Sequence, residues 1–437
     1  MDRRTFHLGA HAMNPTASRT WTQRTAAMVL TGLLVGLSAN VPAAQAIPPP
    51  SVDPGRVPAD GKPGPDQPMR QSNVCARTIT VAEPNVAVTA PGFTMLNIGK
   101  AWQYSTGNGV PVAVIDTGVN PSPRLPAVAG GDYIMGGDGL MDCDAHGTIV
   151  ASVIAAAPQG IPMPARCRLF RRFRRRPVHH RRSRHHHLRG RTPAGGATAA
   201  AVAGDDHRNQ TGTTTTAATA GRRAVKRPGD PTPDQAEDPE VPPPPPGAPD
   251  GVVGVAPHAT IIAIRQSSRA YEPVNPGGGD IEARKKAGTV ATLGSAIVHA
   301  ANMGAKVINV SVTSCVSAAD PLDQSGIGAA VWYAATAKDA VIVAAAGNEG
   351  EDECAQNPSF DPLDPSDPRD WHQVKTVSSP SWFSDYVLSV GAVDNTGAPI
   401  SKSLSGPWVA AAAPGVGIMG LSRKPGTGER LPADTPG

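Results

Sequence analysis

Three short segments carry side chains whose types and order could break an amide bond. They are DTG at 116–118, HGT at 146–148 and AAAGN at 344–348. A carboxylate such as that of Asp116 can orient a histidine, and His146 at the start of a helix can accept and return a proton. The carboxamide of Asn348 can donate a hydrogen bond to a developing oxyanion. Each segment alone is common in structural turns, but the three together predict catalytic Asp116 and His146 with Asn348 as oxyanion donor.

Short apolar, β-branched runs alternate with helical patterns around these segments. Continuous apolar runs of this length are typical of strands buried on both faces of a parallel sheet. The expected strands are 111–115, 260–264, 307–312, 340–345 and 387–393, and the expected helices are 289–302 and 327–338. The pattern predicts an α/β fold, a doubly wound, mostly parallel sheet with helices on both faces and ligands at the carboxyl ends of the strands.

Composition limits the class of protein. Hydrophobic residues make up 40% of the 437 residues, which excludes wholesale disorder. Gly 47 and Pro 46 occur without a three-residue period, which excludes collagen and predicts long loops. The net charge of +4 reflects one tract, because residues 166–191 hold twelve arginines and no acid. The rest of the chain is net negative, so no nucleic-acid partner is expected.

The N-terminal 46 residues have the layout of a secretory signal peptide. Arg19 and Arg24 precede the apolar run 26–39, and the small-x-small triplet Ala44-Gln45-Ala46 follows. Fourteen helical residues rise about 21 Å, which is short of a bilayer core of roughly 30 Å. We expect export, then an extended, loop-dominated N-terminal extension over 47–108.

Five cysteines in an exported chain indicate two disulfides and one unpaired residue, Cys167 in the arginine tract. Chain order suggests Cys75–Cys143 and Cys315–Cys354, one of three possible pairings of these four. A metal site is the competing interpretation, but no C-x-x-C pair or nearby histidine cluster accompanies the cysteines. We therefore expect no metal and no cofactor.

Residues 158–250 form a low-complexity insertion, which we expect to be a disordered surface loop between 109–157 and 251–437, the two parts of the catalytic domain. Its basic part has several interpretations. It could bind nucleic acid or an anionic surface, capture a metal through the histidines at 185–187, or be an ordinary solvated loop. It could also arise from a frameshift, because proline codons read one base late encode Arg, His, Leu or Pro.

The order of DTG, HGT and AAAGN resembles that of the subtilisin-like serine proteases. Further features are similar to the mycosins, the membrane-bound subtilisin-like proteases of type VII secretion systems. These features are the N-terminal extension, the Pro-rich loop after the histidine helix, GVAP at 254–257 leading into IRQS at 264–267, and INVS at 308–311. The resemblance covers roughly residues 73–157 and 251–420.

The resemblance implies a secreted endopeptidase that hydrolyses peptide bonds of exported proteins with an Asp-His-Ser triad. Asp116 would stabilise the imidazolium, His146 would be the general base and then the general acid, and Asn348 would contribute to the oxyanion hole. The segment Ser311, Val312, Thr313 and Ser314 would be the strand that pairs with an extended substrate. The implied partners are a protein or peptide substrate and a type VII secretion membrane complex, in the cell envelope or outside the cell.

The sequence departs from the family after Ala413-Pro414-Gly415, where the family carries its nucleophile in a Gly-Thr-Ser motif. Gly426-Thr427 is followed by Gly428, and neither that motif nor the C-terminal membrane helix of mycosins occurs among residues 416–437. We therefore expect a catalytic domain truncated at its C-terminus and inactive as it stands. The alternative function is a catalytically inactive, protease-like scaffold of a secretion complex. An aspartic protease is a poor rival, because DTG occurs once.

Overall fold

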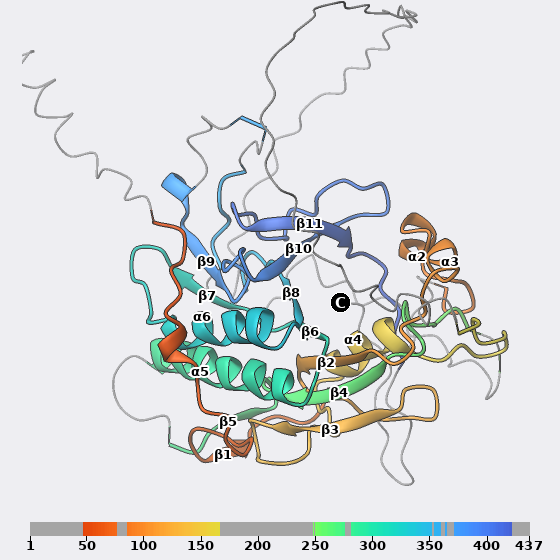
Figure 1. Ribbon diagram of the computed structural model, residues 1–437, viewed down its shortest axis with the longest axis horizontal. Helices are drawn as coiled ribbons and strands as arrows, with labels where there is room; N and C mark the ends of the chain where they lie inside the picture. Colours follow the sequence, from red (N-terminus) through yellow and green to blue (C-terminus); the bar gives the residue numbers. More distant parts are fainter. Residues whose placement is uncertain are drawn as a thin grey trace, which may run out of the picture. The chain divides into compact units, whose positions relative to one another are not determined.

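A seven-stranded parallel sheet forms the centre of the computed structural model, which describes residues 47–76, 85–166, 248, 250–275, 281–351, 354–359, 363–364 and 371–421. The strands lie in the order β11-β10-β8-β6-β2-β4-β3, and each neighbouring pair is parallel (Figure 1). Their bounds are β2 Pro111–Asp116, β3 Ala127–Asp132, β4 Thr260–Arg265, β6 Val307–Val310, β8 Val341–Ala345, β10 Val387–Val393 and β11 Val409–Pro414. The predicted α/β, doubly wound sheet is confirmed.

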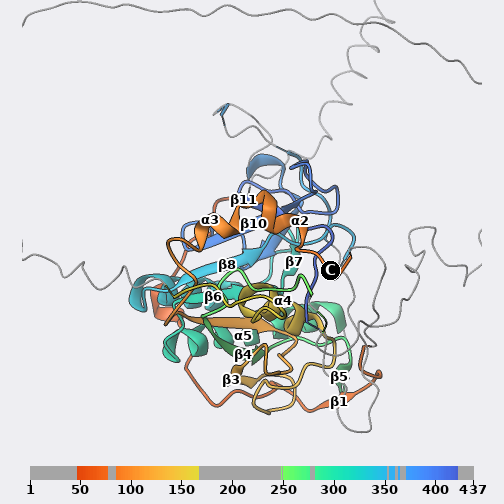
Figure 2. The same ribbon diagram turned by 90° about the vertical axis from the view of Figure 1, so that its right-hand side faces the viewer.

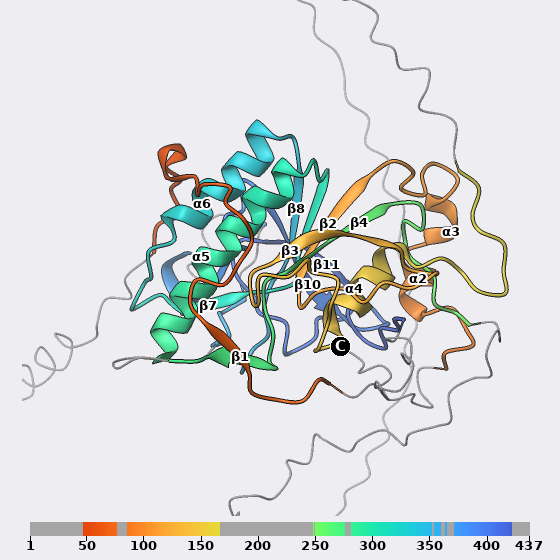
Figure 3. The ribbon, with the colours of Figure 1, turned by 90° about the horizontal axis from the view of Figure 1, so that it is seen from below.

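Helices cover both faces of this sheet, as the apolar runs require. Helix α4 (His146–Ala155) packs on one face, while α5 (Ile281–Asn302) and α6 (Ser325–Trp332) pack on the other (Figure 3). The side chains of alternate residues of β2 point to the two faces of the sheet. Val112 and Val114 join the α4 core, whereas Ala113 and Ile115 join the core under α5 and α6. This alternation places Asp116, the next residue of β2, on the face that carries α4.

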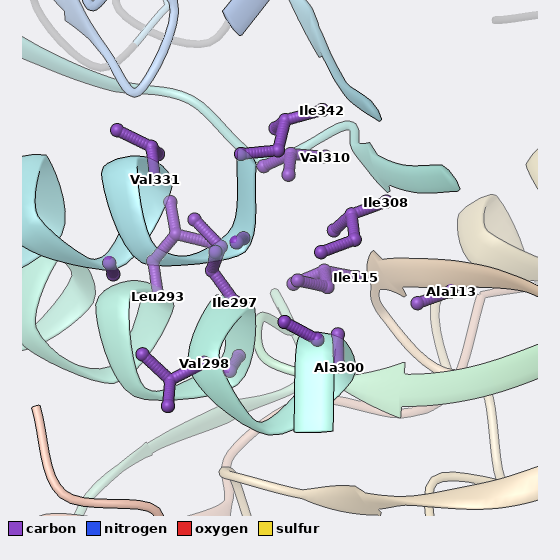
Figure 4. Close-up of a cluster of buried hydrophobic side chains, with 14 of the residues drawn as sticks. Ala113, Ile115, Leu293, Ile297, Val298, Ala300, Ile308, Val310, Val331 and Ile342 are labelled. Atoms are coloured by element: carbon purple, nitrogen blue, oxygen red, sulfur yellow. The ribbon is translucent and has the colours of Figure 1, made fainter. Parts of the chain in front are cut away.

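The larger core lies between the sheet and helices α5 and α6. Leu293 and Ile297 of α5 are fully buried and point toward Ile115, Ile308 and Ile342 of three strands (Figure 4). Burying a side chain of this size contributes about 1.5–3 kcal/mol, so the sheet and these helices form a rigid frame for the strand ends. The expected helix 289–302 is the last part of α5, and the expected helix 327–338 continues beyond α6 as the π-helical turn η3, Tyr333–Ala337.

Two small antiparallel pairs lie outside the main sheet. Strand β1 (Met69–Gln71) pairs with β5 (Tyr271–Pro273), and β7 (Ser314–Ser317) pairs with β9 (Thr376–Ser379). Of the segment 311–314, which is expected to pair with a substrate, only Ser314 lies in a strand of the structure. Ser311, Val312 and Thr313 form no ladder with a neighbouring strand, and the main-sheet strand before them ends at Val310. The remaining short elements are η1 (Pro54–Arg56), α2 (Pro91–Met95), α3 (Ile98–Ala101) and η4 (Trp371–Gln373).

Residues 47–108 are tied to the rest of the α/β fold by packing and by a disulfide. Val52 and Val57 pack against the core under α5 and α6. Helix α2 lies against β11, where Gly92 approaches the ring of Pro414 (Figure 2). Disulfides join Cys75 to Cys143 and Cys315 to Cys354, which is the pairing that chain order suggests.

A half-buried ion pair between Arg124 and Asp250 lies where the two ends of the insertion meet the sheet domain. The Arg124 guanidinium contacts both carboxylate oxygens of Asp250 at 2.6 and 2.9 Å and also donates to the carbonyl oxygens of Ala157 and Val252. The predicted signal peptide 1–46, Cys167, the basic tract with its histidines at 185–187, and Gly426–Gly428 lie outside the described residues. Within the described ranges, no helix is both long and apolar enough to cross a bilayer.

Candidate active site

Asp116 ends β2 as a buried carboxylate. Its side chain is 1% exposed, and its Oδ1 accepts the backbone N–H of Thr117 at 2.6 Å. The apolar run before it keeps β2 in the middle of the sheet, and strand alternation turns its carboxylate toward α4. A carboxylate in such a place is shielded from water and available to a partner on that helix.

His146 is that partner. Its Nδ1 lies 2.7 Å from Oδ1 of Asp116, while 53% of the His146 side chain is exposed. The backbone enters α4 through Ala145 in the left-handed region at φ 65°. Gly147 allows the close approach of helix and strand, because a Cβ there would lie 2.1 Å from the carbonyl oxygen of Gly118. One imidazole nitrogen is thus held by a buried carboxylate and the other edge of the ring is open.

The charges around His146 favour its protonated form. The hydrogen bond and the negative charge of Asp116 raise the pKa of His146 above its ordinary value. Burial and the Arg269 guanidinium act in the opposite direction, and Asp142 adds a smaller upward contribution. The imidazole is therefore a stronger base than a free histidine, which suits proton abstraction from a weakly acidic hydroxyl.

Asp142 is a buried carboxylate near this pair that sequence reasoning missed. It lies four residues before His146 and is 1% exposed. Burial raises the pKa of Asp142 to about 6, against the hydrogen bonds that it accepts from Thr148 and Thr117. At neutral pH it is ionised. An acidic residue at a fixed distance before the histidine is the only signal that could have pointed to it.

Asn348 lies at the carboxyl end of β8, two strands from β2 across β6, in an exposed turn. Gly347 enters this turn at φ 109°, which favours glycine, and the side chain of Asn348 donates from Nδ2 to Oε2 of Glu351 at 3.3 Å. Oε2 of Glu351 also lies 3.4 Å from Nη2 of Arg269. The fold thus brings Asn348 to the same edge of the sheet as Asp116, but within the part of the chain that the structure describes no hydrogen bond links it to His146.

Ser311, Val312 and Thr313 follow β6 at this edge, between the strands that carry Asp116 and Asn348. The N–H of Ser311 donates to the carbonyl oxygen of Ile115 at 3.4 Å, whereas Val312 and Thr313 lie outside the strands of the structure. Among the described residues, no serine hydroxyl is hydrogen-bonded to His146, and no group of three His, Cys, Asp or Glu side chains is placed to hold a metal ion.

Comparisons of the sequence with protein families and with individual proteins point to the same family. The model of the subtilase family, Peptidase_S8, matches residues 107–432. Mycosin-2 of Mycobacterium tuberculosis is 70% identical over 396 residues, which cover 90% of this chain and 72% of that protein.

Solved structures agree with the family match. A chain in the periplasmic assembly from the ESX-5 inner membrane complex has a TM-score of 0.64 and 43% identity, and the match covers 86% of this chain and 75% of that one. The MycP3 protease from the type VII (ESX-3) secretion system has a TM-score of 0.62 and 39% identity, over 87% of this chain and 78% of that one.

Proposed function

Because the chain belongs to the subtilase family and, within it, to the mycosin type of subtilisin-like protease, we propose that it is a secreted endopeptidase of a type VII secretion system. Its substrates are exported proteins, whose peptide bonds it hydrolyses with Asp116, His146 and a serine. The observation that carries the proposal is the 2.7 Å contact between Asp116 Oδ1 and His146 Nδ1, with the carboxylate buried and the ring open.

The proposed reaction gives each proton a donor and an acceptor. Because Asp116 accepts a hydrogen bond from Nδ1–H, Nε2 of His146 carries the lone pair and takes the proton of the serine hydroxyl. The serine oxygen then bonds to the substrate carbonyl carbon, and the C–N bond breaks as His146 returns the proton to the departing amine. Water repeats the sequence on the ester, so the products are a carboxylic acid and a free serine.

Asn348 stabilises the oxyanion during both steps. Its Nδ2–H groups lie on an exposed turn at the carboxyl end of β8, where a substrate carbonyl can reach them. The residues 311–313, and Ser314 at the start of β7, align the substrate backbone. This assignment is supported by the place of this segment after β6, which lies between β2 and β8 in the sheet.

The proposal also covers the organisation and setting of the chain. In it, residues 1–46 are an export signal, 47–108 the extension, 109–157 with 251–437 the catalytic domain, and 158–250 an insertion. The ESX-5 chain belongs to a periplasmic assembly of an inner membrane complex. We assign this protein to the cell envelope with a similar secretion complex as partner.

A second function, an inactive protease-like scaffold in the same complex, is favoured by one observation. Among the described residues, no serine hydroxyl is hydrogen-bonded to His146. A protein whose histidine has no serine partner can retain the fold and the partner surface and still lack hydrolysis.

A fluorophosphonate probe distinguishes the two functions. Protein is expressed from the gene, alongside its His146→Gln variant and its Thr376→Val variant as a matched control. The endopeptidase proposal expects labelling of the gene product and of the control, and loss of labelling in His146→Gln. If the gene product folds but neither labels nor cleaves exported-protein peptides, the scaffold function replaces the proposal.

A further inference from the structure

The carboxylate of Asp142 bonds to both loops that carry the catalytic acid and base. Its Oδ1 accepts the hydroxyl of Thr117 at 2.8 Å, and its Oδ2 accepts the backbone N–H and the hydroxyl of Thr148 at 2.8 and 2.7 Å. Thr117 directly follows Asp116, and Thr148 lies two residues after His146. A single buried carboxylate therefore connects the end of β2 to the first turn of α4.

The hydroxyl of Thr117 completes this connection. It donates to Asp142 and at the same time accepts the backbone N–H of Gly147 at 2.9 Å. Gly147 is the residue after His146, just as Thr117 is the residue after Asp116. The relay from carboxylate to hydroxyl to amide thus fixes the separation of the two backbones whose side chains form the 2.7 Å Asp116–His146 contact.

We propose that Asp142 is a positioning residue for the Asp116–His146 pair and acts on it through the hydroxyl of Thr117. The inference rests on the proposed function, because it concerns the same two residues. Helix capping alone does not account for the contacts. A cap for α4 needs only the Thr148 N–H, whereas Oδ1 bonds to a residue of the neighbouring strand end.

The set of donors requires a carboxylate rather than an amide. Oδ1 accepts the Thr117 hydroxyl and the backbone N–H of Asp144 at 3.1 Å, while Oδ2 accepts the N–H and hydroxyl of Thr148. An asparagine in either orientation would direct its NH₂ group at one of the two backbone N–H groups, and a backbone N–H cannot become an acceptor. Only an ionised acid satisfies all four donors in a site closed to water.

The backbone of Asp142 is held as firmly as its side chain. Asn120 accepts the N–H of Asp142 at 3.0 Å and donates to its carbonyl oxygen at 2.8 Å. The N–H of Asn120 in turn donates to the hydroxyl of Thr148 at 3.0 Å. The loop that follows Asp116 thus also bonds to the backbone of Asp142. A shift of this loop would therefore move the start of α4, and a shift of α4 would move the loop.

The test measures the pKa of His146 by NMR in the 437-residue chain labelled with ¹⁵N-histidine, with the His146 signals assigned from the His146→Gln variant. Replacing Asp142 itself is ambiguous, because its charge also raises the pKa of His146. Thr117→Val keeps that charge and removes the hydroxyl relay. The proposal expects the pKa of His146 to fall by about half a unit or more as the contact with Asp116 loosens, and expects Thr117→Ser to restore it.

Two further variants separate positioning from general loss of structure. Thr376→Val is the matched control, because Thr376 is also buried and its hydroxyl also accepts a backbone N–H, that of Ala355 at 3.0 Å. It should leave His146 unchanged. In an Asp142→Asn background the additional effect of Thr117→Val should vanish, since the two act in one chain of bonds.

A folded Thr117→Val protein with the parent pKa for His146 would overturn the inference. If that variant does not fold, Thr148→Val decides, because it removes a hydroxyl from Oδ2 but keeps the Thr148 N–H bond; a parent pKa in that variant overturns the inference as well. Neither of these pKa measurements requires the nucleophilic serine of the proposed function. Failure of the proposed function shows instead as a gene product without probe labelling.

Discussion

The acid–base half of the site (Asp116, Thr117, Asp142 and His146) and the oxyanion half (Asn348 and Glu351) are built in opposite ways. In the acid–base half, buried carboxylates accept short hydrogen bonds from backbone and hydroxyl groups of two loops. In the oxyanion half, Asn348 and Glu351 are exposed and share one contact of 3.3 Å. The same edge of the sheet thus carries one rigid and one open side.

This difference follows from what each half must do. A general base has to be oriented before the substrate arrives, because its direction and its pKa both depend on the carboxylate partner. An oxyanion donor acts on a charge that appears only during the reaction. A surface contact such as Asn348–Glu351 costs little to break, since exposed pairs contribute about 0–1 kcal/mol. Substitutions in the two halves test whether their contributions to function differ in the same way as their structures.

The largest effect is expected at the buried carboxylate. Asp116→Asn in the gene product should lower kcat by about four orders of magnitude, because the amide cannot hold Nδ1–H of His146 in the required tautomer. Fluorophosphonate labelling rates and peptide hydrolysis both measure this. A loss of less than about tenfold would mean that the 2.7 Å contact does not govern catalysis, and the acid–base half would not be the rigid half in function.

Asn348→Ala should have a smaller effect, a loss of about 10² to 10³ in kcat with KM little changed, as for one oxyanion donor. Thermal unfolding should not move, because the side chain is exposed and makes no buried contact. Steady-state kinetics with a peptide substrate separate kcat from KM. A large fall in melting temperature would contradict the description of this half as open.

In the acid–base half, the sequence predicted the elements that carry Asp116 and His146 but not the contribution of Asp142. A β-branched run before Asp116 and a helical run after His146 sufficed to place both at the carboxyl edge, and β2, β4, β8 and β10 lie within a residue of their expected bounds. Strands β3 and β11 were missed for a physical reason. Their sequences, AVAGGD and VAAAAP, consist of small residues that favour strand only in the context of the sheet, and alanine favours helix in isolation.

Tertiary contacts explain what else the sequence could not give. Asp142 has no pattern of its own, because its partners Thr117 and Thr148 come together only when β2 and α4 pack. Glu351 and Arg269 lie far apart in the chain and meet across the site. The pairing of residues 311–314 with a substrate stays a prediction, because a strand is defined by a partner and the expected partner is the substrate.

The pH dependence gives a third and milder test. His146 must be neutral to act as base, so kcat/KM rises with pH through its pKa. Because Asp116 raises that pKa, the acid limb should have its midpoint above about 6.5, the ordinary histidine value. In Asp116→Asn the midpoint should move to lower pH, while in Asn348→Ala it should stay. If the midpoint of the acid limb also moved in Asn348→Ala, the two halves of the site would be coupled, which would contradict the comparison.

The smallest effect is expected at Glu351, and it bears directly on how open the oxyanion half is. Glu351→Gln removes the charge that Arg269 pairs with and weakens the hold on Nδ2 of Asn348. Because these side chains are solvated, the contact contributes about 0–1 kcal/mol, which corresponds to at most about a fivefold change in kcat/KM. The change should be upward, since the amide is released toward the substrate. A rise of tenfold or more would mean that Glu351 restrains Asn348 strongly, and a fall would mean that it orients the amide for catalysis. In either case the oxyanion half would be held nearly as firmly as the acid–base half, by charges on the surface instead of hydrogen bonds in the core.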